Sequence, residues 1–167
     1  MASQSRSRSR HQAHDKYRQR INQLFNTYEK VVDLEEQAHS AKYLAVLISG
    51  YLEQAIKELL LHYTSQGAMS QISNYVEQTW PISRNMKTQN IKMILSQFDE
   101  KWGDDFQCLF VNDEKKKGHI NSIVEWRNSI AHGKEGNTLG VTIVSVKQAF
   151  KTIIELVTFV ESKVKPQ

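Results

Sequence analysis

Four long stretches of the chain repeat apolar residues at steps of three and four, the spacing that places them on one face of an α-helix. These stretches cover residues 15–38, 40–67, 117–132 and 145–164. The chain has only seven Gly and two Pro among 167 residues, too few for the frequent turns of a β-sandwich or barrel. We therefore predict an all-α protein, a four-helix up-and-down bundle with additional short helices.

The middle of the chain is less regular than its two ends. Its pattern predicts short helices over residues 69–79 and 88–98, and an irregular or short helical segment from 101 to 112. The first of these should stop at Trp80-Pro81, because the residue before a proline avoids the α region. The length of the chain favours a single domain.

The first 14 residues are rich in Ser and Arg and contain nothing to bury, so we predict a flexible tail before a helical domain over 15–167. The first 20 residues carry a net charge of +5 within a chain total of +4, so the rest carries −1. A broad nucleic-acid-binding face is therefore not expected on the domain. The tail fits a solvated terminus better than an RNA-attracting arm or a phosphorylation target.

The sole cysteine and the hydropathy of the chain indicate in which cellular compartment we expect the protein. Cys108 can form neither an intramolecular disulfide nor a cysteine-based zinc site. Its neighbours Phe106, Leu109 and Phe110 suggest a buried thiol. No signal-peptide pattern is present, and the longest nearly apolar run, residues 43–52, is too short for a membrane span. We expect a cytoplasmic protein without a membrane partner.

One segment carries groups suited to phosphate chemistry, and it lies at the end of the predicted helix 117–132. Arg127 offers a permanently charged bidentate clamp, and His132 titrates near neutrality and can transfer protons. Asn128 shares a helical face with His132 and can orient either a phosphate or an imidazole. A histidine in the last turn also complements the helix dipole, so spacing alone leaves both roles open.

Other familiar catalytic or metal-binding patterns are absent from the sequence. It contains no Gly-rich phosphate loop, no HExxH motif, no nucleophile elbow and no EF-hand loop. His11 and His14 are three residues apart, but they lie in the predicted tail with no carboxylate cluster beside them in sequence. We therefore predict no metal site and no cofactor.

The residues at the end of this helix resemble a known motif. Arg127-Asn128-Ser129-Ile130-Ala131-His132, followed by Gly133, resembles the Arg-x4–6-His motif of the HEPN superfamily. The stretch ISGYLEQAIKELLLHY is similar to the corresponding helix of the RiboL-PSP-type HEPN group. HEPN domains are helical bundles of this length that carry the motif on the penultimate long helix.

This resemblance implies a metal-independent RNA endonuclease with a composite site at a homodimer interface. His132 would act as general acid or base at a ribose 2′-OH, Arg127 would bind the scissile phosphate, and Asn128 would fix the phosphate or the imidazole. The expected products carry a 2′,3′-cyclic phosphate and a 5′-OH. Glu53, on the second helix, is a candidate for orienting Arg127 or His132, although it can equally pair with Lys57 four residues on.

The resemblance also implies partners and a biological role. Its partners would be an RNA substrate, a second copy of the chain, and an antitoxin or regulatory protein of a toxin or defence ribonuclease. The same fold also suits a non-catalytic module that binds a nucleotide, an RNA or a protein, or a purely structural dimerising bundle.

Overall fold

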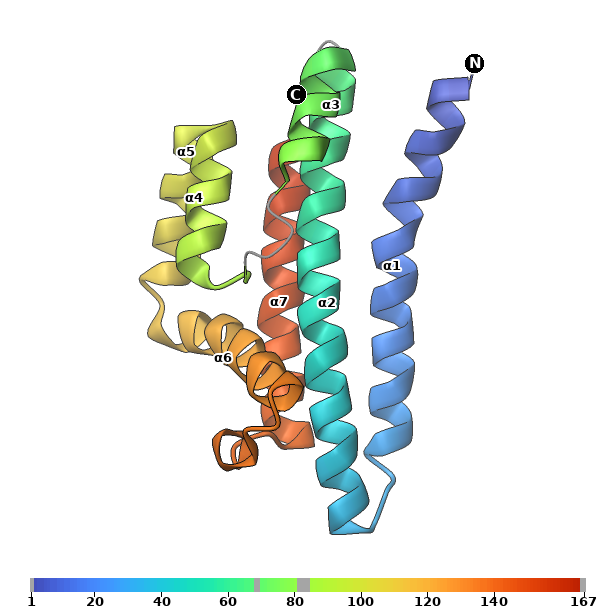
Figure 1. Cartoon of the computed structure of the whole chain (residues 1–167), viewed down its shortest axis with the longest axis vertical. Coiled ribbons are helices and arrows are strands. Elements are labelled where there is room, and N and C mark those ends of the chain that lie inside the picture. The colour runs from blue at the N-terminus through green and yellow to red at the C-terminus, as the bar shows by residue number, and fades with distance from the viewer. Residues whose placement is uncertain (1, 68–69, 81–84, 166–167) are drawn as a thin grey trace.

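The computed structural model describes residues 2–67, 70–80 and 85–165, with side-chain environments given from Ala13 onward (Figure 1). Within these ranges all regular secondary structure is helical, which confirms the predicted all-α class. The elements follow in the order α1 (Ala2–Tyr28), α2 (Leu34–Gly67), α3 (Ser70–Thr79), α4 (Thr88–Phe98), α5 (Glu100–Phe106), the π-helix η1 (Gln107–Val111), α6 (Glu114–Ala131), the 3₁₀-helix η2 (Glu135–Thr138) and α7 (Ile143–Val164).

The long helices α1, α2, α6 and α7 form the predicted four-helix bundle, and α2 packs against the other three. Both termini lie at one end of the bundle, while α6 runs toward the opposite end, where α1 turns into α2 (Figure 1). The shorter helices α4 and α5 form a separate layer outside α6 and α7 (Figure 1). Among the described residues, no helix has the length and apolar character needed to cross a membrane.

Aromatic rings join three of the long helices at the centre of the core. The ring of Phe150 on α7 stacks on Phe25 of α1, with centroids 5.7 Å apart. It also meets the edge of Tyr51 on α2, with centroids 6.0 Å apart. All three side chains are almost completely buried. Burial of these large rings, together with the aliphatic stripes of α2 and α7, provides the main stabilisation of the bundle.

Two helix boundaries differ from the sequence-based expectation because side chains cap the helices elsewhere. The first helix ends at Tyr28 rather than near residue 38, and Asp33 accepts a hydrogen bond from the backbone N–H of Glu36 (2.8 Å) at the start of α2. Similarly, α7 begins at Ile143, two residues before the predicted start at residue 145, because Thr142 and Ser145 form a capping box there.

The N-terminal helix is longer than the sequence pattern indicated. It begins at Ala2, so the domain boundary predicted at residue 15 falls inside α1. A stretch without Gly or Pro can extend a helix that is already nucleated by packing further along the chain. His14, which we placed at the end of the tail, is buried between α2 and α7.

The prediction that Cys108 is buried is wrong, since the structure places this thiol at the surface. Cys108 lies in the π-helix η1, whose wider turn directs Phe110 and Val111 into the core. Phe106, just before this turn, is also buried, whereas Leu109 is half exposed. Apolar neighbours in sequence therefore did not indicate which face of this irregular turn is covered.

Candidate active site

Helix α6 carries the three motif residues on a part of its surface that the core does not cover. Asp113 caps its start by accepting a hydrogen bond from the backbone N–H of Lys116 (3.0 Å). The middle of the helix buries Ile120, Ile123 and Val124. Beyond these anchors, Arg127 and His132 are exposed and Asn128 is half-buried, so the motif can be reached from solvent.

The end of α6 fixes the backbone at His132. The N–H of Lys134 donates to the carbonyl of Ser129 (2.9 Å), and the N–H of Gly133 donates to that of Ile130 (3.2 Å). These two bonds form a Schellman motif, in which Gly133 takes the left-handed conformation with φ +65°. Gly133 directly follows the predicted helix 117–132, the position at which a glycine commonly ends a helix. The motif stops the helix and leaves the His132 imidazole on the surface, just past the last turn.

The structure places Arg127 and Asn128 in direct contact. The Arg127 Nη1 donates a hydrogen bond to the Asn128 Oδ1 (3.1 Å). The backbone N–H of His132 donates to the carbonyl of Asn128 (3.1 Å), one turn earlier in the helix. A guanidinium, an amide and an imidazole are thus gathered at one helix end, a combination that can bind a phosphate and transfer a proton beside it.

Glu53 of α2 lies close enough to Arg127 to feel its charge. Partial burial raises the pKa of the Glu53 carboxyl, while the Arg127 guanidinium and the nearby Ser49 hydroxyl act in the opposite direction. The two helices that carry these residues pack against each other. The structure thus brings the Glu53 carboxyl within electrostatic range of Arg127.

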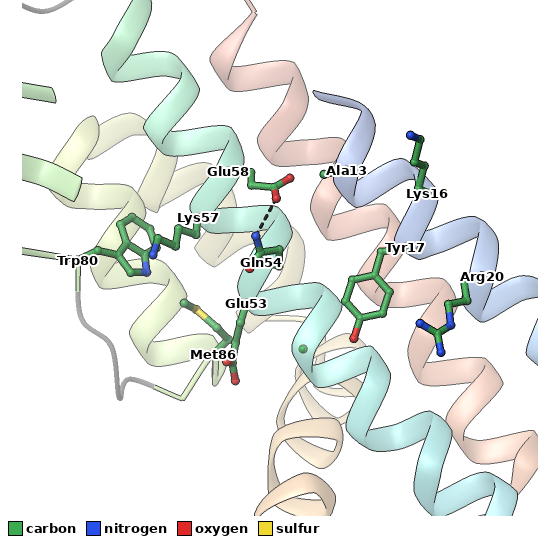
Figure 2. A pocket seen from close by; sticks show the side chains of 11 residues that line it. Ala13, Lys16, Tyr17, Arg20, Glu53, Gln54, Lys57, Glu58, Trp80 and Met86 are labelled. Atoms are coloured by element: carbon green, nitrogen blue, oxygen red, sulfur yellow. Dashed lines mark hydrogen bonds between the residues drawn. The ribbon is translucent and has the colours of Figure 1, made fainter. Parts of the chain in front are cut away.

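A groove of about 810 Å³ opens beside Glu53, between α1, α2 and the chain that joins α3 to α4 (Figure 2). Its walls combine three basic residues and two aromatic rings with two glutamates: Lys16, Arg20, Lys57, Tyr17, Trp80, Glu53 and Glu58. Sequence analysis missed this groove because its residues come from three segments far apart in the chain. The basic spacing of Lys16 and Arg20 on one helical face was the sole available signal.

Replacing Glu53 by glutamine should raise the thermal midpoint at neutral pH. When burial raises the pKa of a carboxyl, its ionisation lowers the free energy of unfolding at pH values above that pKa. This loss disappears once the pH falls below the pKa that the same carboxyl has in the unfolded chain. The gain of Glu53→Gln should therefore shrink as the pH falls into the carboxyl range. The gain in thermal midpoint should also be small, because the Glu53 side chain is only partly buried.

Thermal unfolding at neutral and acidic pH measures this effect. Glu77→Gln is the matched control, because Glu77 is exposed on α3 and its substitution should change nothing at either pH. A lower midpoint for Glu53→Gln at neutral pH would show that the attraction to Arg127 outweighs the cost of burying Glu53.

An all-helical bundle with an Arg–Asn pair and a histidine at the end of its penultimate long helix is the architecture of a HEPN-type domain. The sequence profile of the RiboL-PSP-HEPN family matches residues 14–165, and the chain belongs to this family. Neither a curated protein nor a solved structure matches the chain. The protein is thus an RNase-like HEPN module.

Proposed function

We propose that the protein is a metal-independent RNA endonuclease that acts through Arg127, Asn128 and His132. The observation that carries this proposal is the contact between Arg127 and Asn128 one helical turn from the exposed His132. Glu53 supports it by facing Arg127 from α2. The set offers a phosphate clamp and a proton-transfer group to the same substrate, which is what cleavage by a neighbouring hydroxyl requires.

In this mechanism His132 takes the proton from a ribose 2′-OH, and the 2′ oxygen attacks the adjacent phosphorus. The O2′–P bond forms and the P–O5′ bond breaks, which leaves a 2′,3′-cyclic phosphate and a 5′-oxygen that accepts a proton. Arg127 binds the non-bridging oxygens and offsets the charge that develops on them. Asn128 holds the guanidinium in position through its side-chain oxygen.

A second copy of the chain would supply the histidine that protonates the leaving oxygen. Support for such a dimer comes from large apolar side chains exposed at the end of the bundle where α6 stops: Val32, Leu34, Leu139 and Val144. The ion pair between Lys147 and Glu29 holds α7 and α1 together at this end. An apolar cluster of this kind next to a functional site is typical of an interaction surface.

The groove beside Glu53 would hold the RNA strand next to the cleaved bond. Lys16, Arg20 and Lys57 can bind phosphates there, while Tyr17 and Trp80 can stack on unpaired bases. We also propose that the Ser/Arg-rich residues 1–14, ahead of a single domain over 15–167, attract the RNA backbone. By its family resemblance the enzyme would be a cytoplasmic toxin or defence ribonuclease controlled by an antitoxin or regulatory protein.

Cleavage of an end-labelled RNA in the presence of EDTA tests this function. We expect cleavage with cyclic phosphate and 5′-OH ends, and complete protection when the nucleotide before the cleaved bond carries a 2′-deoxyribose. The same oligonucleotide made entirely of DNA is the control and should stay intact. Products with a 3′-OH, or cleavage of the DNA, would contradict the mechanism.

A non-catalytic binding module is the second candidate, and the groove favours it because basic and aromatic walls bind single strands without any chemistry. In that case RNA is bound and recovered intact, and Arg127→Ala weakens the binding. The cleavage assay and a binding assay on the same RNA therefore separate the two functions.

A further inference from the structure

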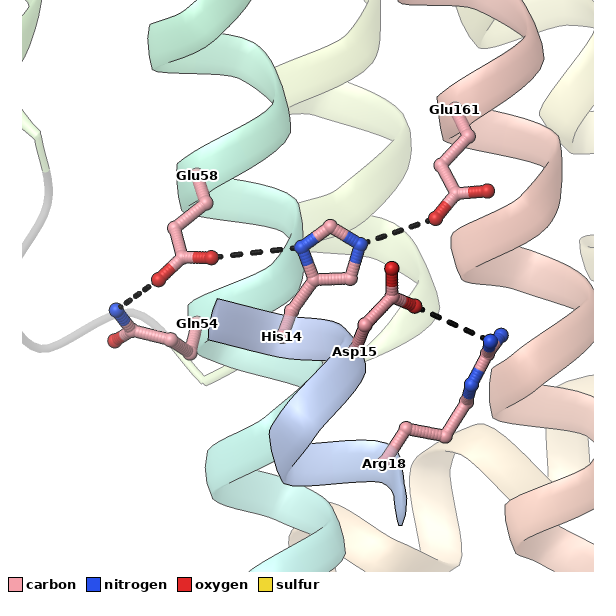
Figure 3. Close-up of polar contacts among 6 residues, drawn as sticks. All are labelled: His14, Asp15, Arg18, Gln54, Glu58 and Glu161. Carbon is pink, nitrogen blue, oxygen red and sulfur yellow. Dashed lines mark hydrogen bonds and ion pairs between the residues drawn. The ribbon is translucent and has the colours of Figure 1, made fainter. Parts of the chain in front are cut away.

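A histidine is buried between two carboxylates on the side of the bundle where α1 crosses α2 and α7. His14 of α1 is 1% exposed. Its Nδ1 lies 3.5 Å from the Glu58 Oε2 of α2, and its Nε2 lies 3.1 Å from the Glu161 Oε1 of α7 (Figure 3). Asp15 follows directly and forms an ion pair with Arg18 at 3.1 Å. One imidazole thus connects three helices.

We propose that His14, Asp15 and Glu161 form a binding site for a divalent transition-metal ion, with Zn²⁺ the best fit. Donor atoms of the three side chains all lie within 4.8 Å of one another. A tetrahedral zinc site with bonds of about 2.0–2.1 Å places neighbouring donor atoms about 3.3 Å apart. The 3.1 Å between His14 Nε2 and Glu161 Oε1 already matches that spacing.

Glu58 lies on the side of the His14 ring opposite to Glu161. A histidine that binds a metal through one nitrogen commonly donates its second N–H to a carboxylate, which fixes the orientation of the ring. The Glu58 Oε2 lies 3.5 Å from the His14 Nδ1, on the side of the ring where such a carboxylate is found. Its other oxygen accepts a hydrogen bond from the Gln54 Nε2 (2.7 Å), so the carboxylate is itself held in place. His14 Nε2 is then directed toward Glu161.

Tyr51 of α2 is a buried polar residue whose hydroxyl feels the charges of the cluster. The side chain is fully buried, and its hydroxyl has no hydrogen-bond partner among the described residues. Burial raises the pKa of Tyr51 to about 12, and the charges of Arg18, Glu161 and Asp15 also act on this hydroxyl. A water bound to the metal as a fourth ligand would accept the hydrogen bond of this hydroxyl.

The charges of the cluster also favour a divalent cation. The cluster contains the carboxylates of Asp15, Glu58 and Glu161 and one guanidinium, that of Arg18. Its net charge therefore remains negative even if His14 is protonated. A divalent ion with a neutral His14 makes the set neutral, which lowers the cost of burying it. Two of the three carboxylates, Glu58 and Glu161, come from α2 and α7, and for this reason the spacing of His11 and His14 in the sequence did not suggest a metal site.

The ion would have a structural role and is independent of the proposed catalysis. It would fasten α1 to α2 and α7, whereas Arg127 and His132 lie at the end of α6. Cleavage in EDTA therefore remains compatible with this site, provided that the bundle stays folded without the metal.

Titration of Zn²⁺ into the metal-free full chain, followed by calorimetry and thermal unfolding, tests the proposal. We expect one ion to bind per chain, and the thermal midpoint to rise by about 5–10 °C at a Zn²⁺ concentration near 100 times Kd. Glu161→Gln keeps the shape of the side chain and should weaken binding at least tenfold, as should His14→Ala.

His39→Ala is the matched control, because His39 is also close to a glutamate, Glu35 at 3.8 Å, but is exposed on α2. It should bind Zn²⁺ like the unaltered protein. The proposal is overturned if the unaltered chain takes up no stoichiometric Zn²⁺, or if Glu161→Gln binds the ion as tightly. In either case His14 serves as a buried link between carboxylates without a metal.

Discussion

Replacing His132 by alanine is expected to lower the rate of RNA cleavage by about 10²–10⁴-fold, the contribution typical of a general acid or base. In the proposed mechanism the substitution removes the group that exchanges protons with the 2′-OH, whereas Arg127 and Asn128 keep their contact. His132 is exposed and lies past the last turn of α6, so its ring supports no packing. The thermal midpoint should therefore stay within about 2 °C.

Initial cleavage rates in EDTA, measured alongside thermal unfolding, check this prediction. His39→Ala again provides the control, since it removes an exposed imidazole from another part of the bundle and should leave the rate unchanged. Equal rates for His132→Ala and the unaltered protein, with both folded, would exclude His132 from the reaction. Arg127→Lys tests the other half of the site, because lysine keeps the charge but loses the bidentate geometry.

Replacing Phe150 by alanine should have the largest effect on stability, about 3–5 kcal/mol. The ring is nearly fully buried where α1, α2 and α7 meet, and it touches both Phe25 and Tyr51. Alanine leaves a cavity that the surrounding helices cannot fill without moving apart. The aromatic contacts, which add to the simple burial of area, are lost at the same time.

Urea unfolding monitored by circular dichroism measures this loss. Val144→Ala is the control on the same helix, because Val144 is exposed on α7 and its truncation should change the free energy of unfolding by less than about 0.5 kcal/mol. Similar values for the two variants would contradict the placement of Phe150 at the centre of the core. If the bundle dimerises through the end that carries Val144, this control should be measured at a fixed protein concentration.

The long helices could be predicted from the sequence because each has a continuous apolar stripe, and Gly133 marked the end of α6 correctly. The break between α1 and α2 was missed, since apolar spacing runs through residues 29–33 and the capping role of Asp33 depends on the local turn. The π-helix around Cys108 has no regular sequence period, so its exposed face could not be inferred.

The site was predictable only where its residues are close in sequence. Arg127, Asn128 and His132 belong to one short segment, and their placement at the end of one helix followed from its period. The closeness of Glu53 to Arg127 depends on how α2 packs against α6, which the sequence left open. The cluster around His14 was missed for the same reason, because α1, α2 and α7 each contribute to it.

The Schellman motif after α6 separates the residues that stabilise the fold from the histidine of the proposed site. Stability depends on the interior of the bundle, whereas the His132 imidazole stands on a glycine turn that leads into an exposed loop. Substitutions at the exposed positions Lys134, Asn137 and Leu139 should therefore cost little free energy of folding, whereas Thr138 between them is buried.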